Sequence, residues 1–241
     1  MDVNKIKAVA FDLDGTLTQH KQPLTPENKA ALDALAKKYR LVMVGAGAVM
    51  RIFNQLGQYP IDVIGNYGMQ YGKYNENTRS IDMIRDASVP CDREKTEKIV
   101  TAFREKYGFT EYRGDNTEFH ASGCITFPVL GTKALIEDKL SFDPDRSKRR
   151  AIYDEVVAAF PDYHVFVGGS SSFDMAPKPY NKYYALDLYA KEHGFKHDEV
   201  VFVGDDYGLG GNDESVYKSD FNFLTIDNYL DFPKVVEELL K

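Results

Sequence analysis

The sequence is poor in cysteine. Its 241 residues include only two, Cys91 and Cys124, which lie far apart and show no metal-ligand spacing. Disulfide-rich secreted domains and zinc sites need cysteines that are more numerous or closer together. The sequence therefore excludes both classes, and a reducing compartment is expected.

The sequence also lacks an excess of positive charge. The formal net charge is −7, whereas nucleic-acid-binding proteins usually present a basic patch. The longest basic cluster is Arg146-Ser147-Lys148-Arg149-Arg150, at the start of an expected helix, where such charges usually form a solvated face. We expect that role for the cluster, and no nucleic-acid partner for the protein.

Long apolar runs are missing as well. No window approaches the roughly 20 apolar residues of a membrane-spanning helix. The apolar run at residues 8–11, which follows a charged start, is far too short for a signal peptide. With 43% hydrophobic residues the composition is typical of a globular protein with a substantial core. A cytoplasmic protein without a membrane partner is expected.

The two ends of the chain predict alternating strands and helices. Strands are expected at 7–11, 40–44, 61–64, 200–203 and 221–226, and helices at 25–38, 49–56, 182–193 and 232–240. Thr25-Pro26-Glu27 combines a capping hydroxyl, a proline in the first turn and an acid, which favours a helix start. Such alternation is typical of a parallel sheet covered by helices.

The middle of the chain does not alternate strictly. Helices are expected at 92–106 and 146–160, and strands at 109–113, 124–129, 163–167 and 171–175. Runs of strands beside helices predict a separate α+β unit. We therefore predict an α/β fold with a parallel-sheet core at 1–81 and 179–241 and an inserted α+β domain at 82–178.

Two aspartates directly follow the first expected strand, in Asp12-Leu13-Asp14-Gly15-Thr16. Two carboxylates so close can be held in different protonation states. Asp12 can then attack an electrophile, while Asp14 passes a proton to and from the ester oxygen. Backbone N–H groups at the turn that Gly15 allows are expected to bind phosphate oxygens. The alternative is an aspartate-rich turn with a helix cap, which does not need both acids.

A second acidic cluster follows the strand expected at 200–203, as Gly204-Asp205-Asp206 and Gly210-Gly211-Asn212-Asp213. The carboxyl ends of parallel strands form the ligand-binding edge of such a sheet. With Asp12, the cluster supplies hard oxygen ligands of the kind that Mg²⁺ prefers. A magnesium site is therefore predicted, and a glycine-rich surface loop is the alternative.

Two weaker signals accompany the acids. Lys182 opens the helix after the insertion, where it can neutralise aspartate and phosphate charge, although a lone lysine at a helix start is usually only solvated. Gly45-Ala46-Gly47 follows another strand and offers N–H groups to an anion, or forms a tight strand-to-helix turn.

Four segments, in this order, resemble the motifs of the haloacid dehalogenase (HAD) superfamily of phosphatases and phosphomutases. They are FDLDGTLT at 11–18, VGAG at 44–47, PKPYNK at 177–182 and VGDDYGLGGND at 203–213. The resemblance implies an enzyme with a Rossmann-like core. The insertion lies where this superfamily carries its larger type of cap domain, which sets substrate specificity.

Within the superfamily, the chain is most similar to the eukaryotic-type phosphomannomutases. The likeness covers nearly the whole chain and includes RIFNQLG at 51–57, GGSSSFDMAP at 168–177, NKYYALD at 181–187 and GGNDESVY at 210–217.

This resemblance implies roles for single residues. Asp12 is the expected nucleophile, Asp14 the acid/base group and Lys182 the lysine that neutralises phosphate charge. Mg²⁺ is expected on Asp12, the backbone of Asp14 and Asp205, with Asp213 nearby. The residues expected to bind phosphate or sugar are Gly45, Ala46, Gly47, Lys21, Arg113, Ser172 and Asp174. Lys21 stands where the family carries an arginine and lacks its bidentate fork.

The sequence departs from the mutases in two places. The second motif lacks the serine or threonine hydroxyl of their GGS, for which backbone N–H groups are the expected substitute. Cap arginines are also missing, because only Arg113 is retained while Thr132 and the pair His120-Ala121 stand at other arginine positions. A mutase must rebind a bisphosphate through its cap, and losing bidentate arginines weakens that grip.

Three functions remain open. The expected one is Mg²⁺-dependent hydrolysis of a sugar phosphate through an aspartyl-phosphate on Asp12. The alternative is a phosphomannomutase that interconverts mannose 1-phosphate and mannose 6-phosphate. A non-catalytic sugar-phosphate-binding module is disfavoured by the retained acids. Mannose, glucose and other hexose phosphates all fit as substrates. The related mutases form dimers through the cap, so a homodimer is a possible partner arrangement. Hinges for cap movement are expected near 80–86 and 176–181.

Overall fold

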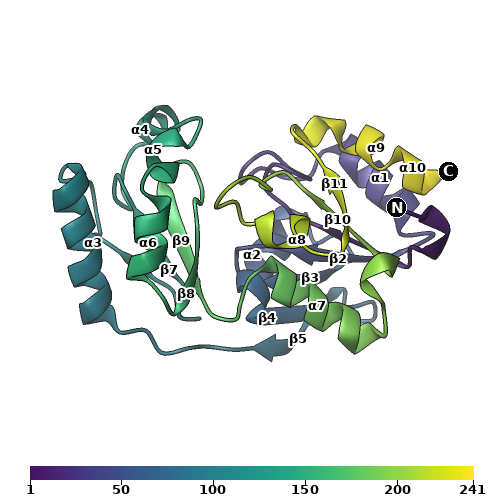
Figure 1. Cartoon of the computed structure of the whole chain (residues 1–241). Coiled ribbons are helices and arrows are strands. Elements are labelled where there is room, and N and C mark those ends of the chain that lie inside the picture. The colour runs from purple at the N-terminus through teal and green to yellow at the C-terminus, as the bar shows by residue number, and fades with distance from the viewer. The chain divides into compact units, whose positions relative to one another are not determined.

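The computed structural model describes all 241 residues. They form two compact units, and Figure 1 labels most of their helices and strands. Unit 1 contains residues 1–87, 180–208 and 213–241, and unit 2 contains residues 88–179 and 209–212. No helix is long and apolar enough to cross a lipid bilayer.

Unit 1 is built on a seven-stranded sheet with the order β11-β10-β1-β2-β3-β4-β5. Five neighbouring strands are parallel: β11 (Asn222–Thr225), β10 (Val200–Gly204), β1 (Ala8–Phe11), β2 (Arg40–Val44) and β3 (Asp62–Gly65). The antiparallel strands β4 (Gln70–Asn75) and β5 (Ser80–Asp86) extend this sheet at one edge. The sheet is therefore mixed, with a parallel centre.

Helices of unit 1 cover the sheet. The α-helices are α1 (Pro26–Leu35), α2 (Val49–Gln55), α7 (Lys182–His193), α8 (Glu214–Tyr217), α9 (Phe232–Val235) and α10 (Glu237–Leu240), and the 3₁₀ helices are η1 (Val3–Lys5), η2 (Asn66–Gly68), η3 (His197–Glu199) and η4 (Tyr229–Asp231). Thr25 caps α1 by accepting the Asn28 N–H at 3.2 Å, and Asn181 caps α7 by accepting the Tyr184 N–H at 2.8 Å. These caps satisfy N–H groups that have no partner within the helix.

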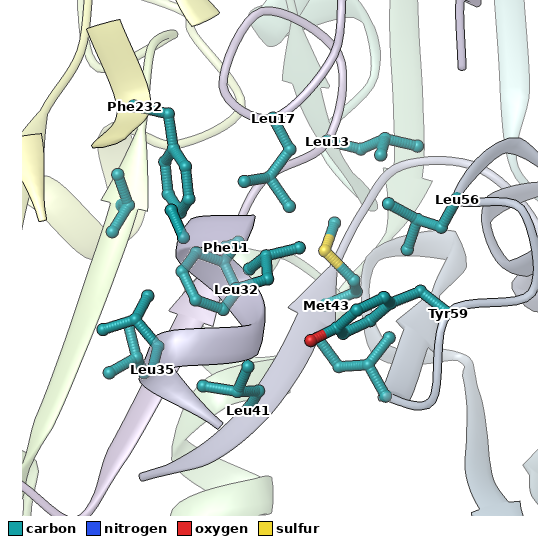
Figure 2. Packing of buried hydrophobic residues seen from close by; sticks show 14 of the residues in the cluster. Phe11, Leu13, Leu17, Leu32, Leu35, Leu41, Met43, Leu56, Tyr59 and Phe232 are labelled. Carbon is teal, nitrogen blue, oxygen red and sulfur yellow. The ribbon is translucent and has the colours of Figure 1, made fainter. Parts of the chain in front are cut away.

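The central strands bury both faces. Successive side chains of a strand point to opposite faces of a sheet, so Val9 and Phe11 of β1 pack in one apolar cluster while Ala8 and Ala10 pack in a second. Phe11 lies near Phe232 in the first cluster, where their ring centroids are 5.7 Å apart (Figure 2). This double burial explains why these strands read as continuous apolar runs.

Unit 2 contains a four-stranded antiparallel sheet with the order β6-β7-β9-β8. Its strands are β6 (Glu118–Phe119), β7 (Ile125–Pro128), β8 (Tyr163–Phe166) and β9 (Ser172–Pro177), and its helices are α3 (Arg93–Tyr107), α4 (Ile136–Phe142), α5 (Ser147–Arg150) and α6 (Tyr153–Ala159). Phe127 and Phe173 stack in its core, with ring centroids 5.9 Å apart. Val100 of α3 and Val156 of α6 belong to the same apolar cluster.

Several expected elements are found with nearly the same bounds, and α7 has the same first and last residue as predicted. The β4–β5 hairpin was not predicted. Because β5 pairs with β4 in unit 1, residues 82–86 do not belong to the second unit, and the prediction that the inserted domain begins at residue 82 is wrong. The chain passes between the units at residues 87–88, 179–180, 208–209 and 212–213.

Unit 2 differs from the predictions in four places. Residues 109–113 form no strand, α4 was not predicted, and the helix expected at 146–160 is interrupted at Ile152, where φ is −113° and ψ is 5°. The basic cluster is not simply a solvated face, because Arg149 is fully buried. Its Nε donates to Asp143 Oδ2 at 2.8 Å, and its Nη1 donates to the Gly168 carbonyl at 2.6 Å.

Candidate active site

The polar residues of unit 1 lie where three neighbouring parallel strands end. Asp12 follows β1, Gly45 follows β2, and Asp205 follows β10, which pairs with β1. The Asp12 N–H continues the ladder by donating to the Val203 carbonyl at 3.0 Å. The sheet therefore brings segments from distant parts of the sequence to one edge, as expected for a parallel fold.

Three carboxylates gather at this edge. One oxygen each of Asp12, Asp205 and Asp213 lies within 4.8 Å of the others. Lys182 joins them, with its Nζ 2.6 Å from Asp12 Oδ1 and 2.6 Å from Asp213 Oδ1. Lys182 and Asp213 are fully buried, so neither is the solvated surface group that the sequence left as an alternative.

The charges in this cluster do not cancel. Burial raises the pKa of Asp205, and the negative charges of Asp12 and Asp213 raise it further. Burial alone would lower the pKa of Lys182, but the attraction of Asp12 and Asp213 outweighs it and raises that pKa. Three acids thus lie close together, and the single ammonium group contacts two of them, Asp12 and Asp213. Their oxygen donors and excess negative charge fit a hard divalent cation.

Glycines allow the acids to pack this closely. A Cβ on Gly15 would lie 2.4 Å from Asp205 Oδ2, and one on Gly204 would lie 2.6 Å from Asp213 Oδ2. Gly15 also has a φ of +103°, in the left-handed region that side chains avoid. Thr16 fixes Asp205 from the other side by donating from Oγ1 to Oδ1 at 2.9 Å.

Backbone N–H groups near Asp12 are only partly available to an anion. The Gly15 N–H donates to the Thr18 carbonyl at 2.8 Å, so this amide is already used. The N–H groups of Leu13 and Asp14 have no acceptor within the protein. Two free donors therefore lie directly after Asp12 in the chain.

The Gly45-Ala46-Gly47 segment also has one paired backbone N–H group and two unpaired ones. The Gly45 N–H donates to the Ile64 carbonyl at 2.9 Å, whereas the N–H groups of Ala46 and Gly47 have no acceptor within the protein. Of the three amides predicted to bind phosphate, only the last two remain unpaired.

The Asp14 carboxylate is held by groups outside the acidic cluster. Its Oδ1 accepts from Gln55 Nε2 at 2.7 Å and from the Lys21 N–H at 2.8 Å, and its Oδ2 lies 3.6 Å from Arg51 Nη2. The Asp14 carbonyl oxygen, which is predicted to bind the cation, accepts no backbone hydrogen bond. Sequence reasoning did not assign Arg51 and Gln55, although their spacing of four places both on one face of α2.

Lys21 contacts Asp14 only through its backbone. The Lys21 side chain is exposed, and its φ of 56° lies in the left-handed region. Any binding of substrate by Lys21 would therefore use an exposed ammonium group.

The other predicted sugar-binding residues lie in unit 2. Ser172 donates from Oγ to the Gly168 carbonyl at 3.1 Å and to Asp174 Oδ1 at 3.3 Å. The Asp174 carboxylate also accepts from Thr126 Oγ1 at 3.0 Å, and burial raises its pKa. Arg113 is exposed. Ser172 and Asp174 thus form one polar group within this unit.

The fold defines the class of protein. The structure resembles an IMP-nucleotidase from Plasmodium falciparum with a TM-score of 0.70 at 17% identity, covering 98% of this chain and 68% of that one. It also resembles a haloacid dehalogenase-like hydrolase from B. subtilis with a TM-score of 0.63 at 17% identity, covering 95% of this chain and 92% of that one. The molecule therefore has the haloacid dehalogenase fold, as predicted.

Sequence relatives narrow the class. The family model described as eukaryotic phosphomannomutase matches residues 28–240. The chain is 29% identical over 224 residues to a phosphomannomutase from Schizosaccharomyces pombe and 27% identical over 221 residues to one from Saccharomyces cerevisiae, covering 87% of this chain and 84% of each relative. The chain belongs to the eukaryotic phosphomannomutase family.

The predicted membership of the HAD superfamily and the prediction of an enzyme are both confirmed. The expectation that the protein hydrolyses a sugar phosphate is less well supported. The matching relatives are named phosphomannomutases, which favours the isomerase that the sequence left as the alternative.

Proposed function

We propose that this chain is a phosphomannomutase that moves a phosphoryl group between positions 1 and 6 of mannose through Asp12. The match to the phosphomannomutase family over residues 28–240 carries this proposal. The buried cluster of Asp12, Asp205, Asp213 and Lys182 supports it, because phosphoryl transfer needs positioning and charge stabilisation above all.

In this proposal Asp12 is the nucleophile. Its Oδ1 is held by Lys182 at 2.6 Å, which leaves Oδ2 to attack phosphorus. Hexose 1,6-bisphosphate would give one phosphoryl group to Asp12, and the aspartyl-phosphate would pass it to the free hydroxyl of mannose 1-phosphate. The resulting bisphosphate would return its other phosphoryl group to Asp12 and leave as mannose 6-phosphate.

Asp14 would act as the acid/base group. It would give a proton to the leaving ester oxygen and take one from the attacking hydroxyl. Gln55 Nε2 and the Lys21 N–H hold its Oδ1, so the carboxyl group is already oriented for this exchange. Orientation of this kind lowers the entropy cost of proton transfer.

The remaining groups would stabilise the phosphoryl group. The unpaired N–H groups of Leu13, Asp14, Ala46 and Gly47 can donate to its oxygens. We propose that Asp12, Asp205 and the Asp14 carbonyl hold Mg²⁺, with Asp213 nearby. When bound, Mg²⁺ would neutralise developing charge on phosphoryl oxygens. Lys182 would offset the negative charge that Asp12 and the phosphoryl group bring together.

We assign substrate selection to unit 2 as a cap domain. Arg113, Ser172 and Asp174 are its proposed contacts to the sugar or to its second phosphate. Ser172 and Asp174 already bond to each other through Oγ and Oδ1, and a hydroxyl next to a carboxylate suits the hydroxyl groups of a hexose.

The test is to incubate the protein with Mg²⁺ and mannose 1-phosphate, with and without a catalytic amount of hexose 1,6-bisphosphate. Mannose 6-phosphate and free phosphate are followed together. Mannose 6-phosphate that appears only with the bisphosphate, with little phosphate released, is the expected result. Failure to form mannose 6-phosphate would refute the mutase proposal.

Hydrolysis of a sugar phosphate is the second candidate. It is favoured by Thr132, which stands where the mutases carry an arginine and whose Oγ1 bonds to Asp115 Oδ2 at 3.0 Å. A cap with fewer arginines grips a second phosphate less well. Release of phosphate without bisphosphate, in the same assay, would identify this activity.

A further inference from the structure

A glycine and an arginine share one small space beside Asp14. An added Cβ on Gly47 would lie 2.2 Å from Arg51 Nη2 and 2.6 Å from Arg51 Cζ. The Arg51 guanidinium therefore fills the space that any side chain at position 47 would need. Position 47 falls in the second motif, which resembles the GGS of the mutases but has glycine in place of serine.

Arg51 is held in place but not enclosed. Its Nη1 donates to Gln55 Oε1 at 2.8 Å, one helical turn along α2. Its Nη2 lies 3.6 Å from Asp14 Oδ2, and 42% of its side chain is exposed. An ion pair at this exposure adds little to stability. The guanidinium is thus oriented at the site while part of it stays open to a ligand.

The surroundings suit an anion. The N–H groups of Ala46 and Gly47 are unpaired, and the guanidinium adds positive charge beside them. A guanidinium binds phosphate through two parallel hydrogen bonds, which a single hydroxyl cannot do. A cationic donor therefore lies where the motif has lost a neutral one.

We propose that Arg51 binds the phosphoryl group of the substrate and replaces the hydroxyl that the second motif lacks. This inference rests on the proposed function for the place of phosphate beside Asp12. It departs from the expectation that backbone N–H groups alone make up the loss. It also explains why glycine stands at position 47, since a serine would displace the guanidinium.

The experiment measures binding of inorganic phosphate by calorimetry, in excess Mg²⁺ and without turnover. Arg51→Ala should weaken binding about 10- to 100-fold, the loss expected for one or two charge-assisted hydrogen bonds. Arg51→Lys keeps the charge but lacks the two parallel donors of a guanidinium, so its phosphate affinity should lie between those of the wild type and Arg51→Ala. Lys73→Ala serves as the charge-matched control, because Lys73 is exposed on β4, three strands from β1.

A rescue variant separates phosphate binding from a structural role. Gly47→Ser alone should weaken phosphate binding, because its Cβ collides with the guanidinium. The φ of Gly47 is outside the left-handed region, so the backbone accepts a serine. In the double variant with Arg51→Ala the space is empty, and the serine hydroxyl should recover several-fold of the lost affinity.

The outcomes are distinct. Phosphate affinity that is unchanged in Arg51→Ala, or too weak to measure in the wild type, would overturn the inference. Loss of thermal stability without loss of phosphate affinity would assign Arg51 a structural role only. If no sugar phosphate is converted while phosphate binding still depends on Arg51, the proposed function fails and the inference stands.

Discussion

Lys182 Nζ lies 2.6 Å from Asp12 Oδ1 and is fully buried. Removing one partner of a buried ion pair leaves an uncompensated charge and typically costs about 3–5 kcal/mol. Lys182→Met should therefore lower the free energy of unfolding by about that amount in the presence of a chelator. Denaturant unfolding followed by circular dichroism measures it.

Mg²⁺ should offset part of that loss, because a divalent cation neutralises the same carboxylates. The gain in unfolding free energy on adding Mg²⁺ is predicted to be larger in Lys182→Met than in the wild type. Lys191→Met, on the exposed face of α7, is the control and should behave like the wild type. An equal effect of both substitutions would argue against the buried cluster.

Gly15→Ala should disturb the acidic cluster directly. Its Cβ would lie 2.4 Å from Asp205 Oδ2, and the φ of +103° is unfavourable for alanine. We expect a stability loss of about 1–3 kcal/mol and weaker Mg²⁺ binding, measured by calorimetry. Gly57→Ala is the matched control, since Gly57 also has a positive φ but its Cβ would meet nothing within 4 Å. If the two variants bind Mg²⁺ equally well, crowding at Asp205 is not important.

The buried Arg149–Asp143 pair should stabilise unit 2. Arg149→Met leaves the Asp143 carboxylate buried without its partner and should cost about 3–5 kcal/mol. Hydrogen exchange should rise across β8 and β9, because Arg149 Nη1 donates to the Gly168 and Ser172 carbonyls at 2.6 and 2.9 Å. The double variant with Asp143→Leu should lose less than Arg149→Met alone. A double variant that is no better would contradict the charge argument.

His197 should give stability a defined pH dependence. Burial lowers its pKa, but its hydrogen bonds to Asp220 and Asp187, at 2.6 and 3.0 Å, outweigh this and raise the pKa above its usual value. A raised pKa stabilises the fold below the unfolded value of about 6.5, and the gain is lost as pH rises through the folded value. The wild type should therefore be more stable than His197→Gln, and this difference should be largest at acidic pH. A difference that grows with pH would contradict this sign.

The parallel centre of the fold and the acids at its edge were predictable from local sequence. Buried strands such as β10 are continuous apolar runs, and a capping Asn181 with a terminal Gly194 marks both ends of α7. The β4–β5 hairpin was missed because its strands carry many polar residues. No residue of β5 is buried, so the strand has no apolar run that would reveal it. Its pairing depends on β3, which local patterns do not reveal.

The candidate site was only partly predictable for a similar reason. Asp12 and Asp205 lie in motifs that can be recognised in the sequence. Asp14 contacts Gln55 and Arg51, which lie in α2, and these contacts form only when the chain folds. Likewise, Arg149 appeared to belong to a solvated basic run, and only tertiary packing against Asp143 shows that it is buried. Sequence predicts which groups reach the sheet edge better than it predicts which groups hold them.

Asp12 is the residue that we propose to carry the phosphoryl group. The most direct measurement is to mix the protein with Mg²⁺ and a sugar phosphate, stop the reaction with acid within one turnover, and map the phosphorylated peptide by mass spectrometry. We expect an acyl-phosphate on Asp12 that is absent in Asp12→Asn, while that variant keeps its fold. A phosphoryl group on another residue, or normal turnover by Asp12→Asn, would contradict it.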